Sequence, residues 1–422
     1  EDVGNGRRAF RFVMDKPVPP YLIAIAAGDI DFRAIGPRSG VWAEPATLDR
    51  AWREVNDTEA MIEAAEELYG EYRWGRYDMI VLPPAFPYGG MENPVMTFLT
   101  PTFIAGDRSN NGLVAHELAH SWSGNLVTNA VWGDGWLNEG VTSYFENRIV
   151  EAVYGKQRAE QEAALAYANI VETLDEVGRD APGTALHNDG EGDLIGSAIA
   201  YDKGHFFMRT VERIVGRERF DAWLQQWFDN HAFEPATSRL LLEDMQENLV
   251  RSPAEAKKLM LREWIFEPGL PANVVKPDPQ AFAQVDAAVH AYATGNTIPG
   301  AFPGWSAAEQ MRFLDNIPKE RTAAQLAALD DTLGLSEAGN NEVLFLWLEL
   351  ALANRYDPAV PRAEKFLSEI GRAKFVRPLF AVLMEQGEWG RPIAKRIYAQ
   401  TRDGYHAVTR GGVDRLMAAD EG

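Results

Sequence analysis

The chain has 422 residues, 46% of them hydrophobic and 12 of them tryptophan, which excludes a disordered protein and allows two or three domains with their own cores. Its 62 acidic residues exceed its 41 basic ones, and the formal charge of -21 argues against nucleic acid and anionic membranes as partners. The absence of cysteine excludes disulfides and thiolate metal sites, so any metal site must use histidine and carboxylate ligands.

No apolar run approaches the roughly 20 residues that a membrane helix needs, so we expect no membrane span. The chain begins at Glu1 and has no signal-peptide pattern, which suggests that a piece has been removed upstream. We expect a soluble protein, and the composition leaves its compartment open between cytoplasm and periplasm.

The first 34 residues predict the end of a β-rich domain. Alternating apolar residues at Phe10, Phe12 and Met14, and the apolar run from Tyr21 to Ala27, predict two strands joined by a proline-rich link. Two strands cannot form a stable domain alone. Further along, the apolar patterns predict a short strand over residues 35–41, a helix over 49–69 and a buried strand over 78–82.

A turn-rich stretch at residues 83–93, PPAFPYGGMEN, leads into a predicted edge strand at 95–99. Paired glycines let the backbone pass close to a ligand, because no Cβ intervenes. Glu92 on such an edge could meet a charged group of a substrate. The alternative is a plain hairpin turn with an exposed glutamate.

His116, Glu117 and His120 form an HExxH pattern inside an apolar run that residues 109–111 could cap. Positions four apart share one face of a helix, so both imidazoles can reach one metal ion. Glu117 would lie beside that ion, where a carboxylate can take a proton from water. The alternative is an amphipathic helix that matches the pattern by chance.

Glu139 offers a third ligand after an eighteen-residue spacer, on a second helix that Asp134 could cap. Two neutral imidazoles and a carboxylate leave zinc an open position for water. The sequence Asn-Glu-Gly at 138–140, together with the glycine motif, argues against a chance match. Glu146, seven residues later, could support a ligand or be an ordinary solvated carboxylate.

Residues 157–177 predict a helix, and residues 189–196 an acidic, glycine-containing loop. Tyr201 opens the next helix, and its hydroxyl could donate a hydrogen bond to a developing oxyanion. A tyrosine packed in the core is the alternative.

Four prolines at residues 264–279 predict an interdomain linker, and the chain beyond is nearly all helix. Amphipathic segments recur near residues 306, 321, 340, 358, 372, 389 and 405, which favours stacked antiparallel helix pairs, as in an α-solenoid. Arg372 and Lys374 flank a predicted turn at 371–378, and composition alone does not distinguish them from solvated basic residues.

Taken together, these motifs identify a family. The chain resembles the zinc aminopeptidases of the gluzincin group, which includes aminopeptidase N and, more closely, leukotriene-A hydrolase. The matching motifs are GGMEN at 89–93, HELAH at 116–120 and NEG at 138–140, and the second glycine of the first motif points to the leukotriene-hydrolase branch. Longer matching stretches run through nearly the whole chain: PPAFPYGGMENPVMTFLTPTFIAGDRS, HSWSGNLVTN, AYDKG, EPGLP and GRAKFVRPLF.

The resemblance implies that His116, His120 and Glu139 bind one Zn²⁺ per chain. It implies that Glu117 is the general base and that Tyr201 stabilises the tetrahedral intermediate. The expected activity is removal of N-terminal residues from short peptides. Hydrolysis of a lipid epoxide, or a catalytically silent zinc-bearing scaffold, are the alternatives.

The resemblance also implies a substrate site for peptides with a free N-terminus. Glu92 would bind the α-amino group, and Arg372 and Lys374 would receive the carboxylate end of the peptide. Asp193 falls where the branch has an aspartate that lines the substrate channel, although the surrounding loop differs. The other substrate-binding residues would be Tyr88, Gly89, Gly90, Met91 and Asn93.

The implied fold class is α+β: a thermolysin-like catalytic zinc domain at residues 35–267, a proline-rich linker at 268–279, and an all-α superhelical domain of armadillo or HEAT type at 280–422. Residues 1–34 would be the remnant of an N-terminal β domain. Family members begin with a saddle-like β domain that contributes glutamine side chains near the substrate amine. That domain is nearly absent here, and we expect it as a possible partner.

Overall fold

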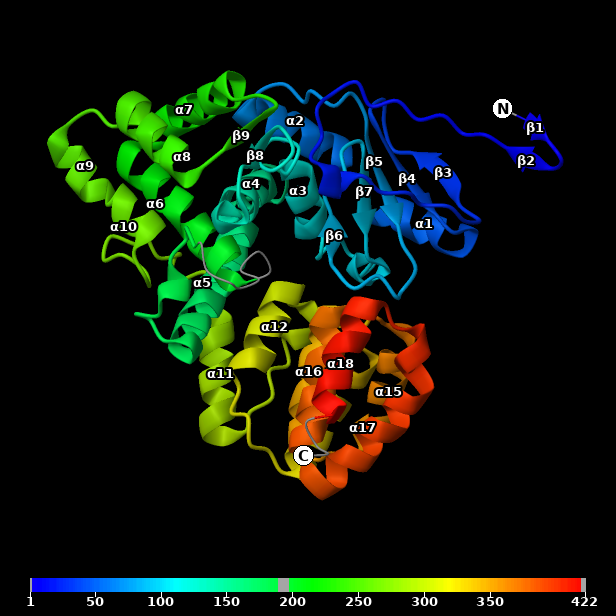
Figure 1. The fold of residues 1–422 in the computed structure, drawn as a ribbon. Helices are drawn as coiled ribbons and strands as arrows, with labels where there is room; N and C mark the ends of the chain where they lie inside the picture. The colour runs from blue at the N-terminus through cyan, green and yellow to red at the C-terminus, as the bar shows by residue number, and fades with distance from the viewer. Residues whose placement is uncertain (1, 189–196, 419–422) are drawn as a thin grey trace.

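The computed structural model describes residues 2–188 and 197–418 of the chain. An upper body combines a sheet with helices, and a second, purely helical body lies below it (Figure 1). The N-terminal segment runs along the upper body and ends in a projecting hairpin. No helix within the described ranges is long and apolar enough to cross a membrane.

Five strands form the sheet of the upper body, in the order β3-β4-β5-β7-β6. β4, β5 and β7 run parallel, whereas β3 and β6 pair antiparallel with their neighbours at the two edges. Every residue of β5 is buried, as is typical of a central parallel strand. The strands are β3 (Asp31–Ala34), β4 (Ser39–Ala43), β5 (Tyr77–Val81), β6 (Gly90–Met91) and β7 (Met96–Leu99).

The sheet corrects two of the three strand predictions and confirms the strand at 78–82 as β5. Residues 35–38 form the turn between β3 and β4 rather than a strand, because the N–H groups of Ile35 and Gly36 both bond to Ser39 O. The strand predicted at 95–99 is formed as β7, but it is not an edge. The glycine motif folds back as β6 and takes that edge, with Gly90 opposite Leu99.

The helices of the upper body pack around α4, which is buried along most of its length because α2, α3, α5 and α6 all contact it. The helix predicted over 49–69 is in fact two helices, separated at residues 55–57, and the one at 157–177 is confirmed as α5. The helices are α1 (Pro45–Glu54), α2 (Thr58–Tyr69), α3 (Gly112–Ala119), α4 (Trp136–Tyr154), α5 (Lys156–Val177), α6 (Gly204–Val215), α7 (Arg217–Asn230), α8 (Ser238–Asp244), α9 (Pro253–Leu259) and α10 (Leu261–Phe266). The short strands β8 (Val127–Asn129) and β9 (Glu234–Ala236) pair in parallel beside them.

The N-terminal strands predicted at residues 10–14 and 21–27 are not formed. The described part of this segment has a small hairpin, β1 (Asp2–Gly4) with β2 (Arg7–Arg8), and one 3-10 turn at Pro20–Leu22. A strand needs a hydrogen-bonded neighbour, and no strand of the five-stranded sheet pairs with these residues. Their apolar side chains therefore stay in solvent, as Phe12 at 87% and Ile25 at 89% exposure show.

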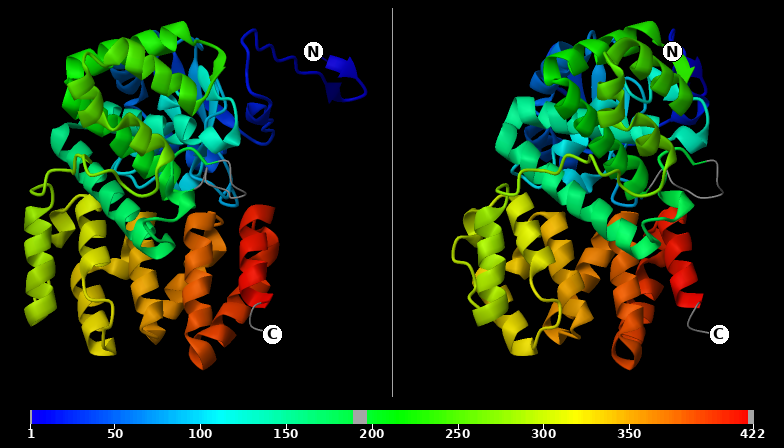
Figure 2. Two further views of the ribbon diagram at one scale, coloured as in Figure 1. Left: turned by 60° about the vertical axis from the view of Figure 1, so that its left-hand side comes forward. Right: turned by 90° about the vertical axis from the view of Figure 1, so that its left-hand side faces the viewer.

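The lower body consists of helices in two layers. α12, α14, α16 and α18 pack side by side, and α15 packs on α17 (Figure 2). All seven predicted helices are confirmed, whereas α11 was missed. Residues 373–378 of the turn predicted at 371–378 form the first part of α16. The helices are α11 (Ala283–Gly295), α12 (Ala307–Asn316), α13 (Ala323–Leu333), α14 (Asn341–Ala353), α15 (Val360–Glu369), α16 (Ala373–Glu385), α17 (Gly387–Thr401) and α18 (Ala407–Ala418).

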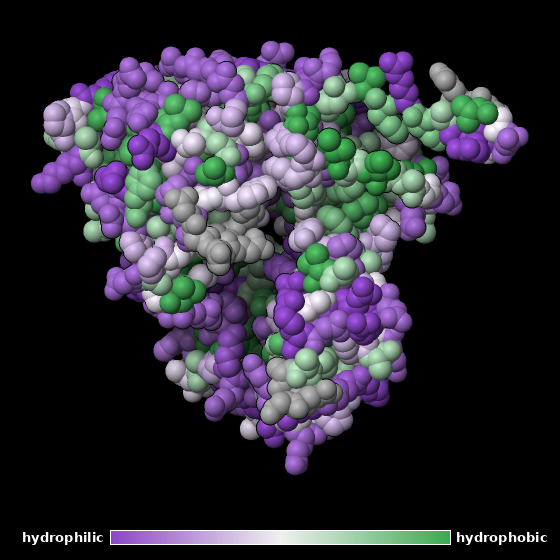
Figure 3. All heavy atoms as spheres, in the orientation of Figure 1, coloured by the Kyte–Doolittle hydropathy of each residue, from purple (hydrophilic) through white to green (hydrophobic). Residues whose placement is uncertain are grey.

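The start of α16 docks on the loop that precedes the glycine motif. Gly371 N donates to Pro84 O at 2.8 Å, and Ala373 N donates to Pro87 O at 2.9 Å. The surface is hollowed where the two bodies meet (Figure 3). α10 ends at Phe266, so residues 264–266 of the proline-rich stretch are helical, and the linker expected at 268–279 follows that helix.

Candidate metal centre and active site

Three donor atoms converge where α3 crosses the start of α4. The Nε2 atoms of His116 and His120 lie 3.1 Å apart, and Glu139 Oε2 lies 3.3 Å from the first and 3.4 Å from the second. One helical turn separates the two histidines, and the packing of α4 against α3 brings Glu139 to them. The three predicted ligands are thus brought together, and all are buried.

The other ring nitrogens have fixed acceptors. His116 Nδ1 lies 3.0 Å from Glu146 Oε2, and His120 Nδ1 lies 3.0 Å from Ser123 O. With a proton on Nδ1, each ring donates to its acceptor and keeps a lone pair on Nε2. Two such lone pairs and a carboxylate fit Zn²⁺ and leave it one further position.

The carboxylates around the donor atoms favour a positive charge on the two histidines or a cation bound between them. Burial alone would raise the pKa of Glu139, yet His120 and His116 outweigh burial and lower that pKa to about 2. Burial likewise opposes a charged His116, but Glu139 and Glu146 raise its pKa well above the usual value. A divalent cation would displace the protons that these groups attract.

Glu117 is buried on α3, and its carboxylate faces the glycine motif. A Cβ on Gly90 would lie 2.0 Å from Glu117 Oε1, so the absence of a side chain at Gly90 leaves room for the carboxylate. Burial raises the pKa of Glu117 to about 8, although His116 and His120 oppose this rise, and a cation at the donors would oppose it further. The position suits a group that accepts and returns a proton.

Tyr201 lies on a π-helical turn, Ile199–Lys203, that leads into α6. Its ring stacks on His116, with ring centroids 5.7 Å apart. Burial, followed by the charges of Glu139 and Glu117, raises the pKa of Tyr201 well above its usual value. Its hydroxyl therefore stays protonated and can donate a hydrogen bond at the donor cluster.

Two glycines allow this turn to approach α4, the helix that carries Glu139. A Cβ on Gly140 would lie 2.4 Å from Ala200 O and 2.7 Å from Gly204 Cα, which are backbone atoms that cannot move aside alone. We expect Gly140→Ala to destabilise the protein by about 1–3 kcal/mol through overpacking. Thermal melting measures this loss, and Gly300→Ala is the control, since a Cβ there meets nothing within 4 Å. Equal melting temperatures for the two variants would contradict the close-approach account.

Glu92 follows β6 and is buried, so the alternative of a hairpin turn with an exposed glutamate is wrong. A carboxylate oxygen of Glu92, one of Glu117 and a ring nitrogen of His120 all lie within 4.8 Å of one another. Asn125 Nδ2 donates to Glu92 O at 2.7 Å, and Tyr21 Oη donates to Glu92 Oε1 at 3.1 Å. The glutamate is therefore held beside the donor cluster.

Arg372 reaches the glycine motif from the lower body. A Cβ on Gly89 would lie 2.7 Å from Arg372 Nη2, so the guanidinium packs directly on that glycine. Glu342, on α14, accepts from Lys374 Nζ at 2.7 Å and from Arg372 Nη1 at 3.5 Å. The basic pair thus borders the motif and shares one acidic partner.

The remaining predicted substrate residues are spread around the motif. Met91 forms β6 with Gly90, Asn93 is buried, and Tyr88 is 49% exposed. Asp193 lies outside the described residues.

The two predicted caps are not formed. Asn111 precedes α3 without a side-chain cap bond, and its amide donates instead to Glu54 O at 2.8 Å. Asp134 lies in a 3-10 turn before α4, and its carboxylate bonds to His187 and Ser238. In both cases the side chain forms hydrogen bonds with a partner distant in sequence and does not cap the helix.

The structure adds three residues that the sequence did not indicate as functional. Tyr21 bonds to Glu92, Asn138 donates to Tyr21 Oη at 3.1 Å, and Glu342 joins Arg372 and Lys374. Asn138 belongs to the Asn-Glu-Gly motif and could have been singled out. The other two carry no local signal.

Comparison with known proteins identifies the family of the chain. The model of the peptidase family M1 domain matches residues 53–264, and the model of the leukotriene A4 hydrolase C-terminal domain matches residues 305–417. Leucine aminopeptidase 2 of Ajellomyces capsulatus is 34% identical over 98% of this chain and 68% of its own length. Leucine aminopeptidase 2 of Aspergillus terreus is 36% identical over 97% of this chain and 68% of its own length.

Among solved structures, yeast LTA4 hydrolase in complex with bestatin superimposes with a TM-score of 0.86 at 29% identity, covering 96% of this chain and 69% of that chain. This similarity shows the predicted fold class, a catalytic domain followed by an all-α domain. The chain therefore belongs to peptidase family M1, as a zinc-dependent hydrolase with a C-terminal domain of the leukotriene A4 hydrolase type.

Proposed function

We propose that the chain removes single residues from the N-terminus of short peptides and binds one zinc ion for this purpose. The observation that supports this most is the spacing of at most 4.8 Å among the Glu92, Glu117 and His120 donor atoms. An ammonium group on Glu92 leaves room for only one residue before the peptide bond reaches Glu117. Relatives named leucine aminopeptidase 2 support the same class of substrate.

His116, His120 and Glu139 would hold the zinc ion. When bound, zinc supplies a Lewis acid and lowers the pKa of a bound water to about 7. Glu117 would take a proton from a water molecule while the oxygen of that water attacks the first peptide carbonyl. Glu117 then gives this proton to the leaving nitrogen as the C–N bond breaks. Tyr201 donates a hydrogen bond to the oxygen that becomes negative.

Glu92 would select substrates by their free amino group. We expect Glu92→Gln to lower kcat/KM for aminoacyl anilides about 10- to 100-fold, because a charge-assisted hydrogen bond contributes roughly 1.5–3 kcal/mol. Steady-state kinetics measures the loss, and unchanged zinc content and melting temperature serve as controls. A Glu92→Gln variant with the kcat/KM of the wild type would show that Glu92 does not bind the substrate amine.

Arg372 and Lys374 would receive the carboxylate end of a short peptide. The packing of Arg372 on Gly89 supports this, as do the acidic partner that it shares with Lys374 and the hollow between the two bodies (Figure 3). Asp193, which lies outside the described residues, is proposed as a substrate-binding residue from the resemblance alone. Tyr88, Met91 and Asn93 would complete the wall around the first residues of the substrate.

The N-terminal segment, residues 1–34, would dock on a β-rich domain. Its exposed apolar side chains support this proposal, among them Phe10 at 76% and Ile23 at 75% exposure. Figure 3 shows hydrophobic residues over this part of the surface.

Lipid epoxide hydrolysis finds less support. It would need a long apolar pocket beside the donors, whereas the apolar pocket of about 450 Å³ meets the site only at Tyr21 and Asn125, which hold Glu92. The scaffold alternative fails because the chain belongs to an enzyme family and its catalytic side chains converge.

Hydrolysis of leucine anilide, a tripeptide and their N-acetylated forms tests the proposed function. We expect turnover of the free-amine substrates and a rate at least about 100-fold lower for the acetylated ones, which lose the ion pair and collide with Glu92. Equal turnover of both forms would show an endopeptidase instead.

A further inference from the structure

A single turn attaches the N-terminal segment to the amine-binding end of the site. Leu22, in the 3-10 turn Pro20–Leu22, is the only buried residue between Val3 and Arg38. Its carbonyl accepts a hydrogen bond from Asn93 Nδ2 at 2.7 Å. Proline at position 20 also restricts the backbone of the turn. An otherwise exposed segment is therefore fixed at the residue next to Glu92.

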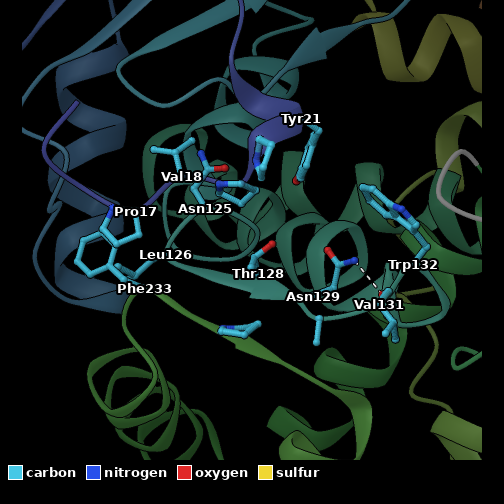
Figure 4. Close-up of a pocket in the computed structure, with 14 residues that line it drawn as sticks. Pro17, Val18, Tyr21, Asn125, Leu126, Thr128, Asn129, Val131, Trp132 and Phe233 are labelled. Atoms are coloured by element: carbon cyan, nitrogen blue, oxygen red, sulfur yellow. Dashed lines mark hydrogen bonds between the residues drawn. The ribbon is translucent and has the colours of Figure 1, made fainter. Parts of the chain in front are cut away.

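The same turn presents Tyr21 to the site. Tyr21 Oη donates to Glu92 Oε1 at 3.1 Å and accepts from Asn138 Nδ2 at 3.1 Å. Its ring makes an edge contact with Trp132, with centroids 5.4 Å apart. Figure 4 shows Tyr21 between Asn125 and Trp132 at the rim of the apolar pocket. Asn125 donates a hydrogen bond to the backbone carbonyl of Glu92, whereas Tyr21 donates one to its carboxylate, so the backbone and the side chain of Glu92 are held by different residues.

These contacts determine how the Glu92 carboxylate is turned. The terminal torsion of a glutamate is soft, so a buried carboxylate does not choose one orientation by itself. When the Tyr21 hydroxyl donates to Oε1 of Glu92, Oε2 is left free to accept from another donor. The same hydroxyl accepts from Asn138, the neighbour of Glu139. Tyr21 thus links the orientation of Glu92 to the helix that carries a metal ligand.

We propose that Tyr21 is a positioning residue that orients the Glu92 carboxylate toward the ammonium group of the first substrate residue. The inference rests on the proposed aminopeptidase function. Tyr21 acts only through Glu92, at a site where the amine and the peptide carbonyl must be placed within a short distance of each other.

Tyr21→Phe removes only the hydroxyl. We expect KM for leucine anilide to rise about tenfold while kcat changes less than about threefold. The substrate ammonium group does not react, so weaker binding of it affects the ground state and the transition state alike. Calorimetry on the zinc-loaded protein should show phenylalaninamide binding about tenfold more weakly. Binding of 3-phenylpropanamide, which lacks the amine, should not change.

Tyr154→Phe is a matched control. Tyr154 Oη also donates to a carboxylate, Asp57 Oδ2, and accepts from an asparagine amide, Asn111 Nδ2, both at 3.1 Å. This variant should bind both ligands as the wild type does.

The outcomes separate the inference from the function on which it rests. Unchanged phenylalaninamide binding in Tyr21→Phe, or an equal loss for both ligands, would overturn the positioning role. A wild type without turnover that still binds phenylalaninamide better than Tyr21→Phe does would support the positioning role and overturn the proposed function.

Discussion

Replacing Glu117 by glutamine should lower turnover of leucine anilide by about 10³-fold or more, because general acid–base catalysis contributes roughly 10²–10⁴-fold. Glutamine has the same shape and still fits against Gly90, but it cannot take a proton from water. Zinc should stay bound, since the donors His116, His120 and Glu139 are untouched. Steady-state kinetics together with the zinc content of the same sample measures both effects.

Glu162→Gln is the control for loss of a buried carboxylate. Glu162 lies on α5 and contacts none of the three donors, although its partly buried carboxylate is near Glu146. Burial raises the pKa of Glu162 to about 7, Arg158 opposes this rise and Glu146 adds to it. Turnover of Glu162→Gln should stay within about threefold of wild type, because Glu162 contacts neither the donors nor Glu117. Wild-type turnover in zinc-loaded Glu117→Gln would show that another group moves the proton.

Replacing Glu139 by glutamine should weaken zinc binding at least about 100-fold, more than the 10- to 100-fold typical of a residue that only supports a ligand. The variant loses the charged member of the donor set, next to two neutral imidazoles. Competition against a chelator measures the affinity.

Glu146→Gln gives the graded comparison, because Glu146 touches His116 Nδ1 rather than the metal position. Its zinc affinity should fall about 10-fold, between Glu139→Gln and the unchanged Glu162→Gln. If Glu139→Gln bound zinc as tightly as wild type, the metal would have to sit elsewhere. Turnover should fall in the same order as zinc occupancy.

Local periodicity explains what could be predicted from the sequence. The two histidines are one helical turn apart, so a helix over residues 112–119 whose C-cap, His120, keeps helical dihedrals brings them together. The helices of the lower body are likewise amphipathic over short stretches, and all seven predicted ones are formed. The formation of these helices depends little on contacts with distant parts of the chain.

Features that depend on distant partners could not be predicted. Phe10 and Phe12 alternate as in a strand, yet no neighbouring strand pairs with them. Asn111 and Asp134 have the right residue types for caps, but side chains and carbonyls far along the chain take their hydrogen bonds. Tyr21 meets Glu92 across 71 residues, a contact that no motif announces.

The most direct test of a one-zinc aminopeptidase is titration of metal-free protein with zinc while turnover of leucine anilide and N-acetyl-leucine anilide is followed. We expect activity on the free amine to rise linearly and stop at one zinc per chain, with the acetylated substrate at least about 100-fold slower throughout. Full activity without zinc, or equal turnover of both substrates at one equivalent, would contradict the account.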